Sequence, residues 1–300
     1  MTNAQGQTIQ LVRGRPAEIW ALLMVLVSCF AIGIAPVLAK LALNGGSNAL
    51  TIVTVRNLVM AFILAVVMAC LRKPFRLPRK ALIRSVAMGP VYILLGMGYL
   101  GAVAYIPVNL TILIYFLHPL LIGIIVRLIG HEAVSLPRIA AFALALAGLG
   151  IAIGVRWTQL NPMGLGLALL SAVACTVMIV SNSVTMKSAD SLAVTFWMVL
   201  SAAIILAVAN LAFGRMVWPH DLSGWVGFAG VGLAYTIGLT LFFVAVPILG
   251  ATRATMLTNL EPLVGIGFAM LLLNEQISLL QALGMALVFL SIAVTELAHP

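Results

Sequence analysis

The stretch Thr258-Asn259-Leu260-Glu261-Pro262-Leu263, followed by Asn274-Glu275 and Ser278-Leu279, has an earlier counterpart in the same chain. The counterpart contains Tyr115-Phe116-Leu117-His118-Pro119-Leu120, then Glu132 and Ser135-Leu136. Pro119 and Pro262 lie 143 residues apart, and the same offset carries Glu132 onto Glu275. The pattern predicts that the chain consists of two halves that are copies of one another.

The composition around this repeat is that of a membrane protein. Of the 300 residues, 63% are apolar and only 8% are charged, far from the balance of an ordinary globular domain. The formal net charge of +9 does not indicate a nucleic-acid-binding protein, because so few charges cannot cover a folded soluble surface. Cys29, Cys70 and Cys175 lie in apolar runs without disulfide or metal-ligand spacing, so we expect no metal and no cofactor.

Ten apolar runs each come close to the ~20 residues that a helix needs to cross a bilayer. We place these helices at 18–40, 48–71, 81–101, 104–129, 137–155, 162–185, 190–213, 223–245, 251–273 and 277–298. The connections are short and rich in turn residues, so there is no room for a soluble domain. The prediction is an all-α integral membrane protein, with one five-helix repeat at 18–155 and a second at 162–298.

Basic residues predict how the chain crosses the bilayer. Twelve of the 16 Lys and Arg residues fall on the side of the N-terminus: Arg13, Arg15, Arg72, Lys73, Arg76, Arg79, Lys80, Arg84, Arg127, Arg138, Lys187 and Arg253. The opposite side holds Lys40, Arg156 and Arg215. The positive-inside rule then makes residues 1–17 a cytoplasmic tail and places both termini in the cytoplasm. Because each half has an odd number of helices, the two repeats are inverted, as in many secondary transporters.

A proline interrupts the fourth and the ninth predicted helix near its middle. Pro119 and Pro262 lack the backbone N–H, so each predicts a bend that frees a carbonyl, that of Tyr115 or of Thr258. Lipid cannot hydrate a freed carbonyl, which must therefore face protein or a water-filled cavity. We predict that Tyr115 and Thr258 line a substrate cavity and that the prolines serve as gating bends. The alternative is a packing kink.

Four ionisable residues within or near the apolar runs have open roles. A charge inside the membrane costs at least about 2.5 kcal/mol unless it is paired or protonated. Glu261 can meet this requirement in three ways: it can bind a substrate amine, accept a coupling proton, or pair with Arg56. His118 can relay protons or serve as a hydrogen-bonded histidine between helices. Lys40 either snorkels to the interface or attracts an anionic group at the mouth of the cavity.

Aromatic and amide side chains are further candidates for the cavity wall. The aromatic candidates are Tyr99, Tyr115, Trp197 and Tyr235, which would surround an amphiphilic solute. The amide candidates are Asn109 and Asn259, with structural hydrogen bonds between helices as the alternative. Glu132 and Glu275 stand where the fourth and ninth helices end, and we expect them to cap a helix or bond a loop rather than to contact substrate.

The two prolines with their downstream glutamates resemble a pattern of the drug/metabolite transporter superfamily, in its EamA-type branch. That branch carries a Pro-(apolar)-Gly-Glu pattern once in each half. Here the pattern is Pro119…Gly130-His131-Glu132 and Pro262…Leu273-Asn274-Glu275, so a histidine is inserted in the first copy and asparagine replaces glycine in the second. Arg56 resembles the arginine of the family's second helix, and Lys40 the lysine that ends its first.

The resemblance covers the whole chain and implies export of small solutes across the bacterial inner membrane, with the YddG-type aromatic amino-acid exporters as the suggested subgroup. We therefore expect a monomeric or homodimeric carrier that works by alternating access. Its expected partners are an amino acid or similar metabolite, the lipid bilayer and a coupling proton, with no nucleic acid. Drugs, nucleotides or sugar phosphates are the alternative substrates.

Two other classes of membrane protein fit the sequence poorly. An intramembrane zinc protease is disfavoured because His131-Glu132 is not followed by a second histidine, and we expect no catalytic residues. A channel is disfavoured because the sequence has no pore-loop signature and no ring-forming set of charges. For a carrier, we expect the third, fourth, eighth and ninth helices to line the cavity.

Overall fold

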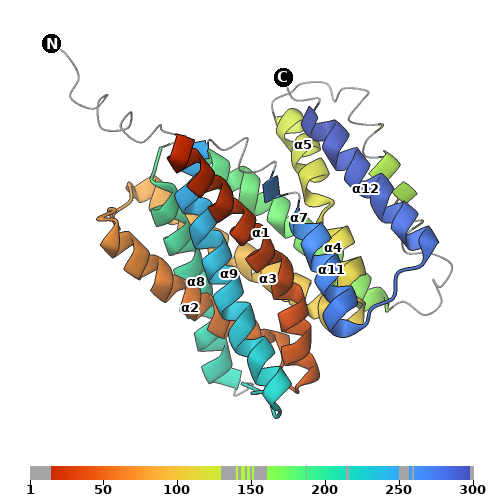
Figure 1. Cartoon of the computed structure of the whole chain (residues 1–300). Helices are drawn as coiled ribbons and strands as arrows, with labels where there is room; N and C mark the ends of the chain where they lie inside the picture. The colour runs from red at the N-terminus through yellow and green to blue at the C-terminus, as the bar shows by residue number, and fades with distance from the viewer. Residues whose placement is uncertain are drawn as a thin grey trace.

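A computed structural model describes residues 15–129, 161–186, 188–213, 216–249, 257–258 and 260–297, with isolated residues between 140 and 151. The helices of the first half are α1 (Arg15–Asn44), α2 (Ala49–Cys70), α3 (Arg79–Tyr105), α4 (Val108–Tyr115) and α5 (His118–Ile129). Those of the second half are α7 (Pro162–Met186), α8 (Ser191–Phe213), α9 (Leu222–Leu249), α11 (Glu261–Leu273) and α12 (Leu279–Leu297). In Figure 1, α1 begins and α12 ends on the same side of the bundle.

Within the described ranges, six helices are long and apolar enough to cross a membrane, namely α1, α2, α3, α7, α8 and α9. Shorter apolar helices accompany them at Val108–Ile122, Glu261–Leu273 and Leu279–Ser291. Many large apolar side chains are exposed, Leu211 by 85% and Phe62 by 70%, as is expected where lipid is the solvent. The prediction of an all-α membrane protein is confirmed.

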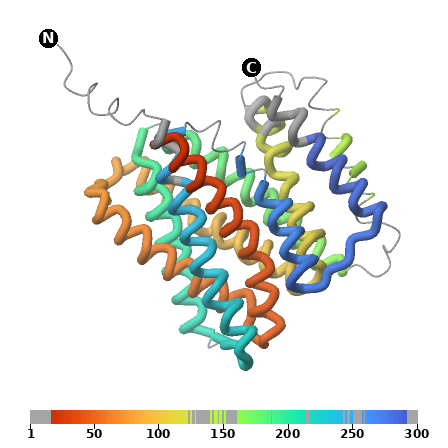
Figure 2. Tube along the Cα trace, in the orientation of Figure 1, coloured from red at the N-terminus to blue at the C-terminus, as the bar shows by residue number. Residues whose placement is uncertain are grey.

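The two halves repeat element by element with the predicted offset. Shifted by 143 residues, α2 covers 192–213 and α5 covers 261–272, each within one residue of the bounds of α8 and α11. The contacts between the halves have the same symmetry, since α1 packs on α9 as α3 packs on α7, and α2 packs on its own counterpart α8. Figure 2 shows the red tube of α1 and the cyan tube of α9 running side by side.

The fourth predicted helix, at 104–129, is wrong as a single element. Residues 104–105 still belong to α3, α4 ends at Tyr115, and α5 begins at His118. Proline explains both interruptions, because Pro107 and Pro119 lack the N–H that a continuous helix needs. Ile106 before Pro107 is also extended, as a residue before proline prefers. In the ninth predicted helix, α11 likewise begins only at Glu261. Much of the helix predicted at 137–155 lies outside the described residues.

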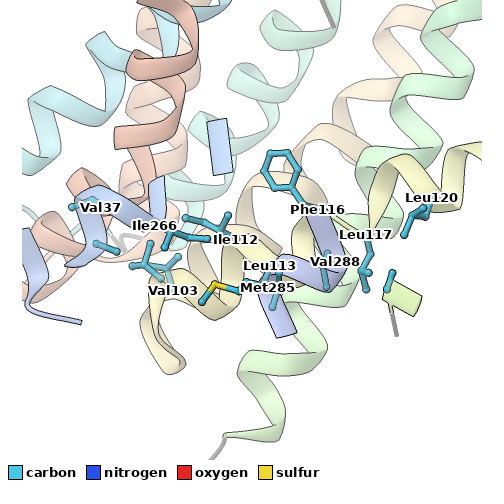
Figure 3. Close-up of a cluster of buried hydrophobic side chains, with 13 residues drawn as sticks. Val37, Val103, Ile112, Leu113, Phe116, Leu117, Leu120, Ile266, Met285 and Val288 are labelled. Atoms are coloured by element: carbon cyan, nitrogen blue, oxygen red, sulfur yellow. The ribbon is translucent and has the colours of Figure 1, made fainter. Parts of the chain in front are cut away.

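An apolar cluster holds the broken helices inside the protein. Figure 3 shows Ile112, Leu113 and Phe116 from α4 and its C-terminal end beside Met285 and Val288 of α12, with Ile266 of α11 close by. Every residue of α4 from Val108 to Ile114 is buried. α11 buries one face, which includes Pro262, Gly265 and Ile266. Both helices therefore pack against protein at the places where cavity-lining helices are expected.

Candidate functional site

The chain interrupts its helix in the same way at Leu117 and at Leu260. Each of these residues donates its backbone N–H to the carbonyl three residues back and accepts a hydrogen bond from the N–H four residues ahead, at distances between 3.0 and 3.1 Å. Pro119 and Pro262 are the second residues of α5 and α11. At such a position the missing N–H costs no helical hydrogen bond. The predicted bends in mid-helix are therefore wrong, because the prolines start new helices.

His118 completes the first of these two breaks. Its Nδ1 lies 3.0 Å from the carbonyl oxygen of Tyr115. Pro119 has no backbone N–H that could donate to this oxygen. A carbonyl oxygen only accepts, so the hydrogen-bond pattern assigns the ring proton to Nδ1. The imidazole also packs on the rings of Tyr115 and Phe116, with centroids 4.8 and 5.6 Å apart. The carbonyl that the sequence predicted to be free is thus satisfied by the neighbouring side chain.

Four of the five tyrosines gather beside this break. We call Tyr92, Tyr99, Tyr115, His118 and Tyr235 the aromatic cluster. The rings of Tyr99 and Tyr115 meet edge to face at 5.0 Å between centroids, and the Tyr115 hydroxyl lies 3.2 Å from the Cys175 sulfur. Tyr235 packs with Tyr99 against one apolar cluster and lies against the cluster that contains Tyr92. The cluster therefore joins α3, α4 and α5 of the first half to α9 of the second.

Arg56 reaches the aromatic cluster from α2. Its side chain is 2% exposed, and its guanidinium carbon lies 4.5 Å from the ring centroid of Tyr235 and 5.9 Å from that of Tyr92. Contact with aromatic faces stabilises a desolvated cation by about 2 kcal/mol, whereas an unpaired buried charge costs several. The ion pair with Glu261 that the sequence left open is absent, since the ion pair found in the described residues joins Lys73 to Asp190.

Glu261 stands at the start of α11, the helix whose Ile266 belongs to the apolar cluster on which Tyr99 and Tyr115 pack. The adjoining backbone is closely packed, because a Cβ on Gly33 would lie 2.9 Å from the Glu261 carbonyl oxygen. The crossing of α1 over α11 therefore positions Glu261 at the cluster.

A third break separates α3 from α4, and two side chains close it. Pro107 has no N–H for the Val103 carbonyl, and the Lys40 ammonium donates to that oxygen instead, at 2.6 Å. On the other side, the first two backbone N–H groups of α4 donate to the carboxylate of Glu275 at 2.7 and 3.1 Å. A cation at the end of one helix and an anion at the start of the next complement both helix dipoles. Glu275 caps a helix, as expected, but one in the other half.

Four other candidates lie away from the aromatic cluster, in a short described segment, or outside the described residues. The Trp197 indole donates to the Phe75 carbonyl at 2.8 Å, so this ring anchors the connection between α2 and α3. The Asn109 side chain accepts from the neighbouring Leu110 N–H at 2.7 Å, beside the Glu275 cap. Thr258 belongs to a short described segment before α11, and Asn259 lies outside the described residues.

The sequence analysis missed three residues of the site. Tyr92 and Gly96 stand seven and three residues before Tyr99, on one face of α3, and Cys175 meets Tyr115 from α7. A Cβ on Gly96 would lie 2.8 Å from Nη2 of Arg56, so the absent side chain makes room for the guanidinium. The helical spacing of Tyr92, Gly96 and Tyr99 is the signal that would have found this face.

Comparison with known proteins identifies the family. The family model described as "EamA-like transporter family" matches residues 19–154 and, a second time, residues 162–297. This chain belongs to the EamA-like transporter family. The two matched segments begin and end 143 residues apart, which is the offset between the halves of the structure.

Known structures agree with this assignment at the level of the fold. A solved structure with the description "Crystal structure of protein" covers 92% of this EamA-like chain and 97% of its own, with a TM-score of 0.60. The two chains share 19% sequence identity, so the likeness concerns the fold alone. No curated protein matches the sequence. The EamA-like chain is thus a multi-pass membrane transporter with two copies of the family domain.

Proposed function

We propose that this EamA-like transporter exports amino acids, the aromatic ones included, across the bacterial inner membrane. The observation that carries the proposal is the aromatic cluster, which lies beside Glu261 and Arg56 where helices of both halves are interrupted. Aromatic walls with a few converging polar groups are typical of small-molecule sites. A guanidinium beside a phenol suits a small solute with an anionic end, and the nearby carboxyl group suits a coupling proton.

Alternating access follows from the way the two halves are joined. The paired breaks at Leu117 and Leu260 divide the fourth and ninth helices near the cluster, and the prolines keep these divisions in place. Rocking of one set of helices against the other about the pseudo-twofold axis then exposes the cluster first to one side and then to the other. Arginine and lysine between α2 and α3 support a cytoplasmic location for both termini.

Glu261 is the group to which we assign the coupling proton. His118 is a weaker candidate, because its Nδ1 already serves the Tyr115 carbonyl. Glu261 lies among phenols and has no ion-pair partner within the described ranges. A carboxyl group in that setting can carry a proton across the cycle without leaving an unpaired charge in the membrane.

The rival substrate class consists of drugs and anionic metabolites such as nucleotides or sugar phosphates. In the sequence, that alternative depended in part on Lys40 as an anion contact at the mouth of the cavity. The Lys40 ammonium donates to the Val103 carbonyl, where it completes the end of α3. This placement favours the amino-acid proposal, which needs no second cation.

The test is uptake into liposomes that contain the purified protein. We expect saturable uptake of some labelled amino acids, with countertransport, and a response to an imposed pH gradient. Tyr99→Ala should reduce uptake strongly, whereas the matched control Tyr105→Ala should not, because Tyr105 is 54% exposed at the end of α3. Saturable uptake of nucleotides or drugs, with no uptake of any amino acid, would overturn the proposal.

A further inference from the structure

Arg56 carries a buried positive charge for which the described residues supply no counter-ion. Its Nη2 atom has no hydrogen-bond partner, and its Nε donates only a long bond of 3.4 Å, to the side chain of the adjacent Asn57. No described carboxylate lies within 4.0 Å of the guanidinium. Arginine stays charged inside a protein, so the group cannot escape this cost by losing a proton. The missing partner must come from elsewhere.

The described surroundings of Arg56 leave its buried Nη2 atom without an acceptor. Tyr92 and Tyr235 lie near its faces, with ring centroids 5.9 and 4.5 Å from the guanidinium carbon. Aromatic faces attract the charge but accept none of the in-plane N–H bonds. Gly96 lies against Nη2 and offers only backbone, since a Cβ there would approach to 2.8 Å. The unpartnered Nη2 and the uncompensated charge together point to an anionic ligand with acceptor oxygens.

We propose that Arg56 binds the carboxylate of the transported solute, an inference that rests on the proposed function. A guanidinium and a carboxylate form two parallel hydrogen bonds in a planar fork, and this pairing supplies the acceptor that Nη2 lacks together with the missing negative charge. The side chain of the solute then lies against Tyr99 and Tyr115. The substrate class is therefore the α-amino acids with a free carboxyl group.

The unmodified protein provides the first test. Uptake of labelled L-phenylalanine is measured in liposomes against unlabelled L-phenylalanine, L-phenylalaninamide and 2-phenylethylamine, which keep the ring and the amine but differ at the carboxyl group. We expect the amide and the amine to inhibit at least about tenfold more weakly, because a site built to bond a group rejects analogues that lack it. Equal inhibition by the acid and its amide would overturn the role of Arg56.

Variants then assign the discrimination to this residue. Arg56→Gln should raise the KM for phenylalanine by about tenfold or more and abolish the preference for the acid over the amide. Arg56→Lys retains the charge without the planar fork and should keep part of the preference, which also guards against a folding defect. Arg84→Gln is the matched control, because Arg84 is exposed on α3. A wild-type preference for the acid over the amide in Arg56→Gln would contradict the assignment.

A separate readout distinguishes failure of this inference from failure of the proposed function. The Tm of the purified protein is measured with 3-phenylpropionate, 3-phenylpropionamide and inorganic phosphate. If no amino acid is transported but 3-phenylpropionate alone raises the Tm, and does so only with Arg56 present, the carboxylate site stands and the export proposal falls. If phosphate raises the Tm instead, or if neither anion does, the carboxylate assignment is wrong.

Discussion

The carboxylate of Glu275 accepts a 2.7 Å hydrogen bond from the backbone N–H of Val108, so a side chain of the second half caps a helix of the first. A cap of this kind contributes about 1 kcal/mol of folding free energy, with a range of 0.5–2. Glu275→Ala should therefore lower the Tm by about 2–4 °C for each kcal/mol lost. The control is Gln276→Ala, since Gln276 is the exposed neighbour. Equal Tm values for the two variants would show that the cap contributes nothing.

The stability effects of substituting Lys40 and Pro107 should depend on each other. Lys40→Met leaves the Val103 carbonyl without a donor, and an unsatisfied buried acceptor costs about 1–3 kcal/mol. Pro107→Ala introduces a backbone N–H, which in a continuous helix would donate to the Val103 carbonyl. We expect Lys40→Met to cost less in the Pro107→Ala background than in the wild-type protein. The measurement is a double-mutant cycle of unfolding free energies, and strict additivity would disprove the dependence.

Pro119 and Pro262 should matter for turnover more than for stability. Substitution by alanine restores an N–H that can compete for the carbonyl of Tyr115 or Thr258, so the two helix segments can join. Pro119→Ala should leave the Tm unchanged or raise it, while uptake becomes several-fold slower, and Pro262→Ala should behave alike. Pro90→Ala is the control, because this proline lies inside α3 at an exposed position. Wild-type turnover in both test variants would exclude a role of the breaks in transport.

Glu261→Gln should separate coupling from binding. If Glu261 carries the coupling proton, the variant should lose accumulation driven by a pH gradient but keep exchange of substrate across the liposome membrane. The control is Glu18→Gln, an exposed carboxylate near the start of α1. Both activities are measured in the same preparation. Accumulation that still follows the pH gradient in Glu261→Gln would assign the proton to another group.

Lys73 and Asp190 form a salt bridge of 3.0 Å, yet their substitutions should differ in cost. The pair is solvent-accessible, and exposed pairs contribute about 0.2–1 kcal/mol. Asp190 also accepts from the N–H groups of Leu192 and Ala193 at the start of α8, a cap that contributes about 1 kcal/mol more. Asp190→Ala should therefore lower the Tm clearly further than Lys73→Ala. Only the effect of Lys73→Ala should vanish at high salt.

The repeat could be predicted from Pro119 and Pro262 because proline marks a position that the backbone must respect in both copies. The same residues misled the sequence analysis about geometry. A proline inside an apolar run fits a bend as well as a new helix, and the choice depends on the turn formed by Leu117 and its neighbours. That turn depends on tertiary contacts, which no local pattern contains.

Spacing along one helix brought some residues of the candidate site together, but it could not predict how separate helices rotate and meet. Tyr115 and His118 are three residues apart and do lie together. Trp197 is aromatic like Tyr115, but it contacts the connection between α2 and α3. The packing of α8 against α2 and α3 sets the rotation of α8 about its axis and thereby the direction of this side chain. The position of Arg56 over Tyr235, rather than beside Glu261, likewise results from how α2 meets α9.

The exchange of partners between the halves, with α1 on α9 and α3 on α7, has a consequence for biosynthesis. When the ribosome completes the first half, α1 and α3 are already inserted, but the helices that they pack on have not been made. The faces of α1 and α3 that pack on α9 and α7 lack these partners until the second half arrives, as helices do between insertion and association. The mature arrangement thus forms only late in translation, and a chain truncated after the first half cannot acquire it.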